Sequence, residues 1–436
     1  MLRIEDTDRA RLKPGSQASI EEGLRWLGMA WDERPFVQSE RRDAYQQAAQ
    51  LLLESGAAYR CFCTPERLEQ MRAEQRARRE PERYDRRCRS IPRQEADRRA
   101  AASERFVVRQ AIPLEGTTVF HDLVMGTVSF RNDTLDDHVL LKSDGFPTYH
   151  LAFVVDDHET RISHVIRGDG WLPSAPKHLL LFQAFTWLPP AFAHVPLVLG
   201  PDKKPLAKRH GAKDVLEYRD AGYLPEAVDN FIAFLGWSPG TEEDILTMEQ
   251  LIAKFSLEKI QPSPAIANLE RLEWINGQFI RRLPADELAA RLAPRFAEAS
   301  VDALRPLIPL VQERLRSLNE APDMLRFFFQ EPGPLRVEQL TPKGKDPAAV
   351  ATALSRAATM LRDLTEWTPE SIEPALRGLA ENLGWSSRDL FMALRVAITG
   401  RTVTPPLIES MARLGKDRVL VRIERAVAAL ADPLPG

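Results

Sequence analysis

The pattern of hydrophobic and polar residues changes its period along this chain. Apolar residues recur at three- and four-residue steps over residues 17–29 and 40–55, the spacing of one helix face, and Gly56 can end the second helix. Thr64 and Pro65 resemble a helix start, a capping hydroxyl followed by a first-turn proline, and a very polar segment follows them. We therefore predict a helix in each of these segments.

After the polar helix the period becomes two. Short alternating segments separated by Gly, Asp and Asn predict antiparallel strands: RFVVR, TTVFH, GTVSF and HVLLK. Two apolar, β-branched runs follow, TYHLAFVVDD and ISHVI, and then the helical segment PKHLLLFQAF. Continuous apolar runs are expected for strands that are buried in a parallel sheet. The middle of the chain is therefore predicted to be an insertion within an α/β domain.

Beyond residue 225 the pattern is mostly helical. Apolar residues at helical spacing occupy these segments: EAVDNFIAFLGW, LEWINGQFIRRL, ALRPLIPLVQERLRSL, AVATALSRAATMLRDL, SRDLFMALRVAI and RVLVRIERAVAAL. The sequence contains no internal repeat and no low-complexity segment. The C-terminal third is therefore expected to be all-helical.

Composition and charge narrow the class of protein. A length of 436 residues allows roughly two to four domains, and 44% hydrophobic with 28% charged residues is the balance of a folded chain. No apolar run approaches the roughly 18 residues of a membrane helix, and the charged start does not fit a signal peptide, so the cytoplasm is the expected location. A net charge of -3 argues against a globally basic nucleic-acid binder, so such contacts are expected only from local patches.

Two charged segments are candidates for binding sites. The opening RIEDTD is either a carboxylate cluster that pairs with an ammonium group or a solvated acidic turn. The segment GPDKKPLAKRHGAKD, residues 200–214, either holds a polyphosphate or is a basic surface loop.

Tyr149, Arg167 and Trp171 lie at or just beyond the ends of the two apolar runs, where open α/β sheets bind ligands. Arg167 there is expected either to clamp a carboxylate or to pair with a structural Asp.

The three cysteines indicate a metal site rather than a disulfide framework. Cys61, Cys63 and Cys88 supply three soft ligands, and a tetrahedral zinc site requires a fourth. No histidine lies between residues 1 and 120, so Tyr84 is the candidate fourth ligand, with buried free thiols as the alternative. The arginines that crowd the same segment form either a patch for a phosphate backbone or a solvated, ion-paired helix face.

The order and spacing of these segments resemble one family closely, the class I glutamyl-tRNA synthetases. The resembling blocks run from residue 2 to about residue 425: LRIEDTDR, YRCFCTPERLEQMRAEQRARREPERYDRRCR, LLKSDGFPTYHLAFVVDDH, VIRGDGWLPSAPKH, LAKRHGA, FLGWSP, LEWINGQFIR and TGRTVTPPLIESMARLG. The resemblance implies a multidomain α/β plus all-α protein. Its expected domains are a split Rossmann-like catalytic domain (1–60 and 148–225), an acceptor-stem-binding insertion (61–147), a stem-contact helical domain (226–290) and an all-helical anticodon-binding domain (291–436).

The same resemblance implies a reaction and its participants. ATP with Mg²⁺ would activate L-glutamate to glutamyl-adenylate, releasing diphosphate, and the glutamyl group would pass to tRNA(Glu). By position in the motifs, Glu5 is expected to bind the amino group of glutamate, and Tyr149 with Arg167 its carboxylates. The remaining expected roles are catalysis by Lys208 and Arg209 of the KMSKS-type loop, ATP contacts by Lys208 and Trp171, tRNA contacts by Asp8 and Arg314, and zinc binding by Cys61, Cys63, Tyr84 and Cys88. A monomer is expected.

The chain also departs from the family pattern. In the family, RIEDTD follows about 35 to 40 residues that hold the first strand of the nucleotide fold and the HIGH-type motif, so a misassigned start or a truncated gene is expected here. Pro205 and Ala207 replace a lysine and a serine of the KMSKS-type loop, and Ser90 stands where zinc-binding members often have histidine. A non-catalytic tRNA-binding protein and an inactive truncated synthetase therefore remain alternatives. The helical region after position 230 disfavours the shorter relative that modifies queuosine in tRNA(Asp).

Overall fold

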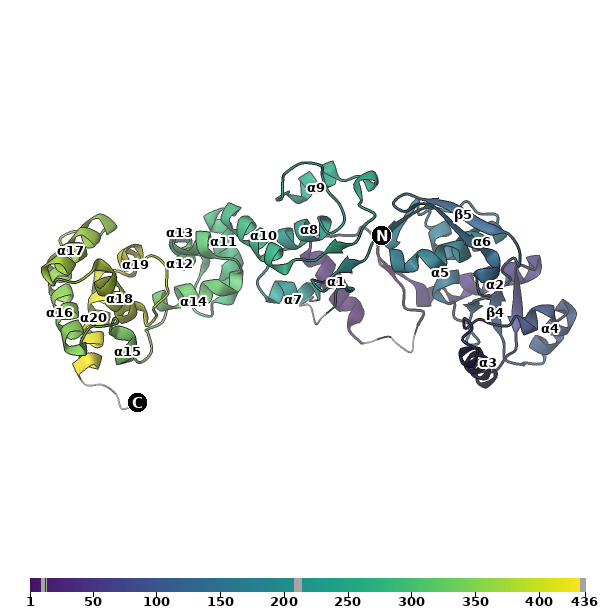
Figure 1. Ribbon diagram of the computed structural model, residues 1–436, viewed down its shortest axis with the longest axis horizontal. Coiled ribbons are helices and arrows are strands. Elements are labelled where there is room, and N and C mark those ends of the chain that lie inside the picture. The colour runs from purple at the N-terminus through teal and green to yellow at the C-terminus, as the bar shows by residue number, and fades with distance from the viewer. Residues whose placement is uncertain (9–11, 13, 208–213, 432–436) are drawn as a thin grey trace. The chain divides into compact units, whose positions relative to one another are not determined.

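The structure is a computed structural model that describes residues 1–8, 12, 14–207 and 214–431. The chain divides into two units, each made of two separate segments of sequence. Unit 1 comprises Met1–Leu216 and Asp229–Asn268, and unit 2 comprises Glu217–Val228 and Leu269–Gly436. Figure 1 labels most of the helices and some of the strands.

All described strands belong to unit 1, where they form four sheets. The strands are β1 (Arg3–Ile4), β2 (Phe36–Val37), β3 (Ala58–Cys61), β4 (Val107–Gln110), β5 (Thr117–Asp122), β6 (Gly126–Arg131), β7 (Val139–Leu141), β8 (His164–Gly168), β9 (Ala191–Val195), β10 (Val198–Leu199) and β11 (Ala265–Ile266). One sheet has the order β6-β5-β9-β8, with β8 and β9 parallel and β5 and β6 antiparallel. A second, antiparallel sheet has the order β3-β4-β7, while β1 pairs with β2 and β10 pairs with β11.

Helices of unit 1 cover these sheets and supply most of its core. They are α1 (Ser16–Trp26), α2 (Arg42–Ser55), α3 (Pro65–Ala77), α4 (Arg93–Ala101), α5 (Tyr149–Glu159), α6 (Ala175–Ala184) and α9 (Met248–Lys254). Figure 1 shows α2, α5 and α6 close to β5, and their apolar side chains meet in one cluster with the strands. Leu52 of α2, Leu151 of α5, Phe182 of α6 and Phe192 of β9 belong to this cluster, which fixes the position of α5.

The helix and strand signals of the first half are largely confirmed. α2 ends at Gly56, which has a φ of 77° that favours glycine, and the Thr64 hydroxyl accepts a hydrogen bond from the Arg67 N–H at 3.3 Å to cap α3. The four alternating segments form β4, β5, β6 and β7, and ISHVI forms β8. Gly56 and Thr64 therefore mark the two helix ends as the sequence indicates.

One prediction in this region is wrong. TYHLAFVVDD forms the helix α5 rather than a buried strand. Residues 151–157 are all buried, so α5 is enclosed on every side and shows no polar face that would reveal a helical period. A short continuous apolar run fits a buried helix as well as a buried strand, and periodicity alone does not separate the two.

Unit 2 contains only helices among its described regular elements, as expected for the C-terminal third. They are α10 (Leu269–Arg282), α11 (Ala285–Leu292), α12 (Val301–Leu304), α13 (Ile308–Val311), α14 (Ala321–Leu325), α15 (Val337–Leu340), α16 (Pro347–Asp363), α17 (Pro369–Asn382), α18 (Ser387–Thr399), α19 (Leu407–Leu414) and α20 (Lys416–Ala431). α7 (Val215–Asp220) and α8 (Pro225–Ala233) each carry residues of both units. Residues 303–318 form several short helices rather than one long helix, because Pro306 and Pro309 lack the N–H that a continuous helix requires. Among the helices that the structure describes, none has the length and apolar character needed to cross a membrane.

Candidate amino-acid and metal sites

The predicted ligand-binding residues Tyr149, Arg167 and Trp171 meet at one end of β8. Arg167 lies on β8 and its Nη1 donates a hydrogen bond to the Tyr149 hydroxyl at 3.2 Å. Tyr149 is the first residue of α5, and its ring centroid lies 4.6 Å from that of Trp171, which belongs to the 3-10 helix η4 (Asp169–Ser174). Trp171 is 45% exposed, so one face of this aromatic pair remains open to a ligand.

The acidic opening of the chain reaches the same site. The Arg3 side chain on β1 contacts Glu5, with 3.2 Å between Nε and Oε1, and forms an ion pair with Asp157 at the end of α5. Burial raises the pKa of Tyr149, Arg167 partly opposes this rise, and the negative charges of Glu5 and Asp157 add to it. Arg3 and Asp157 are assigned no site role in the sequence analysis, although both belong to the motifs that carry the resemblance.

The side chains near Tyr149 therefore carry charges of both signs. Arg3 and Arg167 are cations, Glu5 and Asp157 are carboxylates, and Arg3 forms an ion pair with each of these two carboxylates. Glu5 is exposed and can accept hydrogen bonds from an ammonium group. A small molecule with one ammonium and more than one carboxylate group matches this arrangement.

Buried imidazoles lie behind Arg167. Its Nε donates to His194 Nε2 at 3.1 Å, and its Nη1 lies 3.4 Å from His178 Nδ1. Both histidines are fully buried, and burial lowers the pKa of each below its usual value, so both rings are neutral at pH 7. His194 Nδ1 in turn lies 2.6 Å from Asp122, a buried carboxylate at the end of β5. Neither histidine was predicted, because each lies in an apolar segment.

The cysteine cluster converges as the sequence suggests. Cys63 Sγ lies 3.6 Å from Cys88 Sγ, and the Tyr84 hydroxyl lies 3.2 Å from Cys61 Sγ and 3.4 Å from Cys63 Sγ. The hydrogen bond with Cys88 lowers the pKa of Cys61 to about 4 and raises the pKa of Cys88. All three sulfur atoms lie within 4.8 Å of one another, so they offer one shared position for a soft metal ion.

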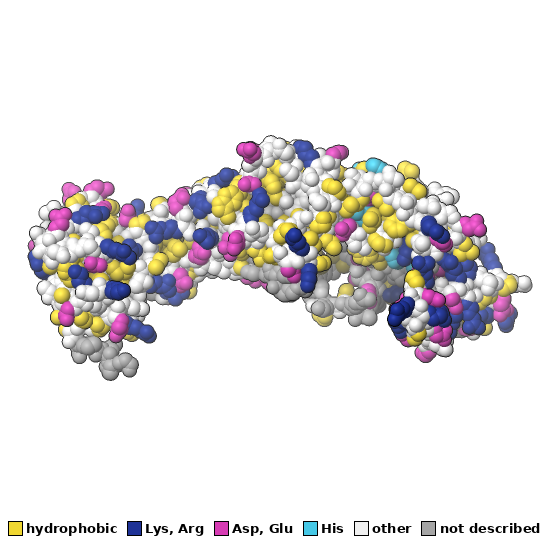
Figure 2. All heavy atoms as spheres, viewed as in Figure 1, with side chains coloured by type: hydrophobic (Ala, Val, Ile, Leu, Met, Phe, Trp, Pro, Cys, Tyr) yellow, Lys and Arg dark blue, Asp and Glu magenta, His cyan; other side chains and the backbone are white. Residues whose placement is uncertain are grey.

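Arginines around this cluster are largely paired with carboxylates. Arg76 contacts Glu82 at 3.1 Å as well as Glu69, and Arg78 contacts Glu80 at 3.0 Å. Figure 2 shows blue and magenta side chains side by side over this part of the protein, where α3 lies. The surface is therefore a mixed one, and the pairing lowers the charge that α3 offers to a phosphate backbone.

The basic loop is described only up to Ala207, so Lys208 and Arg209 lie outside the described residues. Before them the chain makes a tight turn: the Gly200 N–H donates to the Lys204 carbonyl at 2.8 Å, and the Leu206 N–H to the Val198 carbonyl at 2.9 Å. Lys203 and Lys204 are exposed on this turn. Asp8, at the other predicted position near the site, is also exposed.

Arg314 lies in unit 2, on the rim of a cavity of about 630 Å³. Its Nη1 donates to the Thr404 carbonyl at 3.1 Å. The cavity is lined by cations, carboxylates and one half-exposed indole: Arg281, Arg314, Arg316, Glu270, Glu273, Glu313, Trp274 and Gly277. Side chains of this kind can stack on a base and hold a phosphate.

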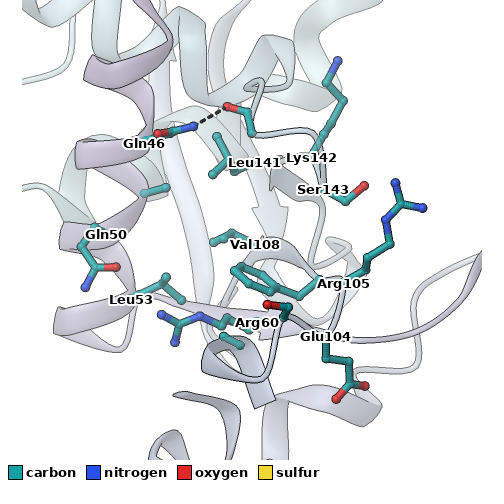
Figure 3. A pocket seen from close by; sticks show the side chains of 15 residues that line it. Gln46, Gln50, Leu53, Arg60, Glu104, Arg105, Val108, Leu141, Lys142 and Ser143 are labelled. Atoms are coloured by element: carbon teal, nitrogen blue, oxygen red, sulfur yellow. Dashed lines mark hydrogen bonds between the residues drawn. The ribbon is translucent and has the colours of Figure 1, made fainter. Parts of the chain in front are cut away.

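Another cavity, of about 450 Å³, opens beside α2 (Figure 3). Gln46, Gln50 and Leu53 of α2 form one wall, and Lys142 and Ser143 lie across from them. The Gln46 Nε2 closes one end by donating to the Gly145 carbonyl at 3.3 Å. None of the described residues that line it is a predicted site residue, so this cavity is separate from the site around Tyr149.

Comparison with known families identifies the class of protein. Residues 1–274 match the catalytic domain of class I tRNA synthetases (E and Q), and residues 287–427 match an anticodon binding domain. The chain belongs to the class I tRNA synthetase family of the E and Q type. Both the family resemblance and the α/β plus all-α fold class expected from the sequence are confirmed.

Individual relatives with a similar sequence or structure are glutamate–tRNA ligases. The glutamate–tRNA ligase of Dehalococcoides mccartyi strain BAV1 is 44% identical over 449 residues, which cover 99% of this chain and 91% of the relative. That of Acidothermus cellulolyticus is 44% identical over 455 residues, covering 99% and 89%. The crystal structure of a glutamate tRNA ligase from Elizabethkingia meningosepticum in complex with its amino acid is similar with a TM-score of 0.87 at 34% identity, covering 98% of this chain and 92% of that one.

Proposed function

We propose that this chain is a glutamate–tRNA ligase. Glutamate and ATP, with Mg²⁺ on its phosphates, give glutamyl-adenylate and diphosphate; the terminal ribose of tRNA(Glu) then takes the glutamyl group and AMP leaves. The observation that carries the proposal is the 44% identity to a glutamate–tRNA ligase over 99% of this chain, through both units. No observation on the described residues favours the alternative of a tRNA-binding protein without catalysis.

The site around Tyr149 suits glutamate as the amino-acid substrate. Glu5 would accept hydrogen bonds from the ammonium group, and Arg167 with the Tyr149 hydroxyl, 3.2 Å apart, would donate to a carboxylate. The guanidinium is planar and presents parallel N–H groups that match a carboxylate. A neutral side chain in place of the second carboxylate would leave such a donor unpaired, which is how a polar site rejects an analogue.

ATP is proposed to bind beside Trp171, whose ring is half-exposed next to Tyr149. An open indole face offers a stacking surface for a nucleotide base. Lys208 and Arg209 are proposed to stabilise the phosphates as diphosphate leaves, because fixed cations near developing negative charge lower the barrier. The exposed Lys203 and Lys204 on the preceding turn add positive charge to this loop, where Pro205 replaces the first lysine of the family motif.

tRNA is proposed to contact both units. Arg314, on the rim of its cavity with Trp274, would contact the anticodon arm, and Asp8 and unpaired arginines of residues 60–89 would contact the acceptor end. On this view the catalytic domain is residues 1–60 and 148–225, the acceptor-binding insertion 61–147, the stem-contact domain 226–290 and the anticodon-binding domain 291–436. We further propose that the enzyme acts as a monomer in the cytoplasm, where tRNA is charged.

Zinc is proposed to occupy the cysteine cluster. With Zn–S bonds of about 2.3 Å, tetrahedral geometry separates two sulfur ligands by about 3.8 Å, and Cys63 and Cys88 are 3.6 Å apart. The Tyr84 hydroxyl lies 3.2 Å and 3.4 Å from two of the sulfurs, which supports Tyr84 as the proposed fourth ligand. The site lies away from the amino-acid residues, so the metal would stabilise the fold of the insertion rather than act in the chemistry.

The decisive experiment is charging of purified tRNA(Glu) with radiolabelled glutamate. We expect the protein to form glutamyl-tRNA that depends on ATP and Mg²⁺, and Glu5→Gln to lower kcat/KM for glutamate about a hundredfold, the value of a hydrogen bond to a charged group. Glu33→Gln, at an exposed carboxylate, is the control and should match the parent. Salt-dependent tRNA binding with no glutamyl-tRNA formed would overturn the proposal in favour of the non-catalytic alternative.

A further inference from the structure

Behind the amino-acid site a carboxylate, an imidazole and a guanidinium form a line that runs across three adjacent strands. Asp122 ends β5, His194 lies on β9 and Arg167 on β8, in the sheet order β5-β9-β8. Asp122 and His194 are both 0% exposed, while Arg167 is only partly buried. The line therefore runs from the interior of unit 1 to the surface of the site.

Asp122 is held in one orientation by its own hydrogen bonds. Its Oδ1 accepts from the N–H groups of Val124 at 3.0 Å, Met125 at 2.9 Å and His194 at 3.1 Å, and its Oδ2 lies 2.6 Å from His194 Nδ1. Burial alone would raise the pKa of Asp122, but the hydrogen bonds from His194 and from the backbone lower it overall. Asp122 is thus an ionised acceptor, so His194 Nδ1 carries the proton.

This proton fixes the tautomer of His194. The ring is neutral because burial lowers its pKa, so with the proton on Nδ1 the other nitrogen, Nε2, has a free lone pair. Arg167 Nε donates to that lone pair at 3.1 Å. The opposite tautomer would place two N–H groups against each other at this distance.

The imidazole keeps the charge of Arg167 available. Among the described residues, no carboxylate forms an ion pair with Arg167, and its hydrogen-bond partners are neutral: His194, His178, Tyr149 and the Trp171 carbonyl. A carboxylate in direct contact would orient the guanidinium but would also compensate its charge. A neutral imidazole between them transmits the orientation of Asp122 without that compensation.

We propose that Asp122 and His194 form a positioning pair that sets the plane of the Arg167 guanidinium for the carboxylate of the amino-acid substrate without placing a carboxylate of the protein in direct contact with the guanidinium. The inference rests on the proposed function, in which Arg167 binds glutamate. Neither residue touches the substrate; each acts through Arg167.

Two substitutions at one position separate the two contacts of His194. In His194→Gln the amide reaches the place of Nε2 and can still accept from Arg167 Nε, whereas in His194→Asn the amide reaches only the place of Nδ1 and can still donate to Asp122. Both variants lose the same ring and leave cavities of similar kind, so their thermal stabilities should be close. The readout is KM for glutamate and KM for ATP in tRNA charging at saturating tRNA.

We expect His194→Asn to raise KM for glutamate by about tenfold to a hundredfold, the loss of a hydrogen bond to a charged group, and to leave KM for ATP unchanged. His194→Gln should raise KM for glutamate several-fold less than His194→Asn does. Equal effects of the two variants on KM for glutamate, or no effect, would overturn the inference. The proposed function would still hold in that case if the parent enzyme charges tRNA. A parent enzyme that charges no tRNA would instead overturn the proposed function.

Asp122→Asn tests the tautomer and keeps the volume of the side chain. Its amide nitrogen would present N–H to His194 Nδ1, which favours the tautomer with the proton on Nε2, facing Arg167. We expect a rise in KM for glutamate like that of His194→Asn. A variant with lower thermal stability but unchanged KM for glutamate would show that Asp122 supports only the fold.

Discussion

Tyr84 is the residue on which the character of the cysteine cluster depends. Its hydroxyl accepts a hydrogen bond from the Cys88 N–H at 3.0 Å and contacts the sulfurs of Cys61 and Cys63. The hydroxyl oxygen and the sulfurs therefore form one group of candidate metal ligands. Three sulfurs bind zinc on their own, with water in the fourth place. With zinc bound as proposed, Tyr84 would replace that water by a ligand that belongs to the chain.

Metal analysis of the purified protein checks this site. We expect about one zinc per chain, none in the variant Cys61→Ser with Cys63→Ser, and a Tyr84→Phe variant that binds zinc but loses it to a chelator about tenfold faster, since three thiolates remain. A parent protein without zinc would leave only three free thiols, two of them buried. Retention of zinc by Tyr84→Phe at the parent rate would remove Tyr84 from the ligand set.

The sequence predicts which site residues carry chemistry better than it predicts what orients them. Glu5, Tyr149 and Arg167 stand in recognisable motifs, and the structure brings them to one place. His194 stands alone in the apolar strand AFAHV, where a buried histidine is usual, and Asp122 ends a surface hairpin strand. Their roles depend on pairing between strands that are distant in sequence, which a single chain does not reveal.

At the scale of elements, α2 shows how one helix face supports the core. Leu52 is 0% exposed within the cluster of α2, α5 and α6, whereas its neighbour Leu51 is 56% exposed on the opposite face. α5 lies against this face and carries Tyr149 at its first turn and Asp157 at its last. Packing of α2 against α5 therefore fixes both ends of the amino-acid site.

Leu51 and Leu52 give a matched pair of substitutions. We expect Leu52→Ala to lower the free energy of unfolding by about 2 to 5 kcal/mol because a cavity remains in the core, and Leu51→Ala to change it by less than about 0.5 kcal/mol. Helix propensity changes equally in both, so the difference reports burial alone. Chemical denaturation followed by circular dichroism measures the free energy of unfolding of each variant. Equal decreases in the two variants would contradict the burial of Leu52 and the exposure of Leu51.

The packing of α5 explains why its sequence was wrongly predicted to form a strand. α2 and α16 have one apolar and one polar face, so their period is visible in the sequence. α5 is surrounded by α2, α6 and the strands and needs no polar face, and its valines suit a strand as well. The helical state of α5 is decided by its tertiary surroundings.

At the scale of the whole molecule, the net charge of -3 bears on how tRNA is held. The overall charge does not attract a polyanion, so local cations have to supply phosphate contacts, and Arg314 is the cation proposed for this role in unit 2. We expect the Kd for tRNA(Glu) to rise at least about tenfold between 50 and 200 mM salt, and Arg314→Ala to reduce the slope of log Kd against log salt by about 1. Arg377, already paired with Glu373 at 2.6 Å, is the control, and filter binding across salt concentrations measures both slopes.

An unchanged slope in Arg314→Ala would show that Arg314 contacts no phosphate.

The α/β plus all-α class follows from periodicity and motif order, because long helical segments and short alternating strands leave separate signals. The division into units does not follow from the sequence, since it depends on contacts of a short segment, residues 217–228, with residues far along the chain.

That segment is part of unit 2 by specific contacts. The Leu224 N–H donates to Asn276 Oδ1 at 2.8 Å, and the Leu318 N–H donates to the Gly222 carbonyl at 2.9 Å. Gly222 has a φ of 86°, and a Cβ there would lie 2.5 Å from the Ser317 hydroxyl, so only glycine fits. An expression fragment cut at the start of the anticodon family match, residue 287, would lack both this segment and its anchor Asn276. A separable unit 2 therefore has to join residues 217–228 directly to residues 269–431, leaving out residues 229–268, which belong to unit 1.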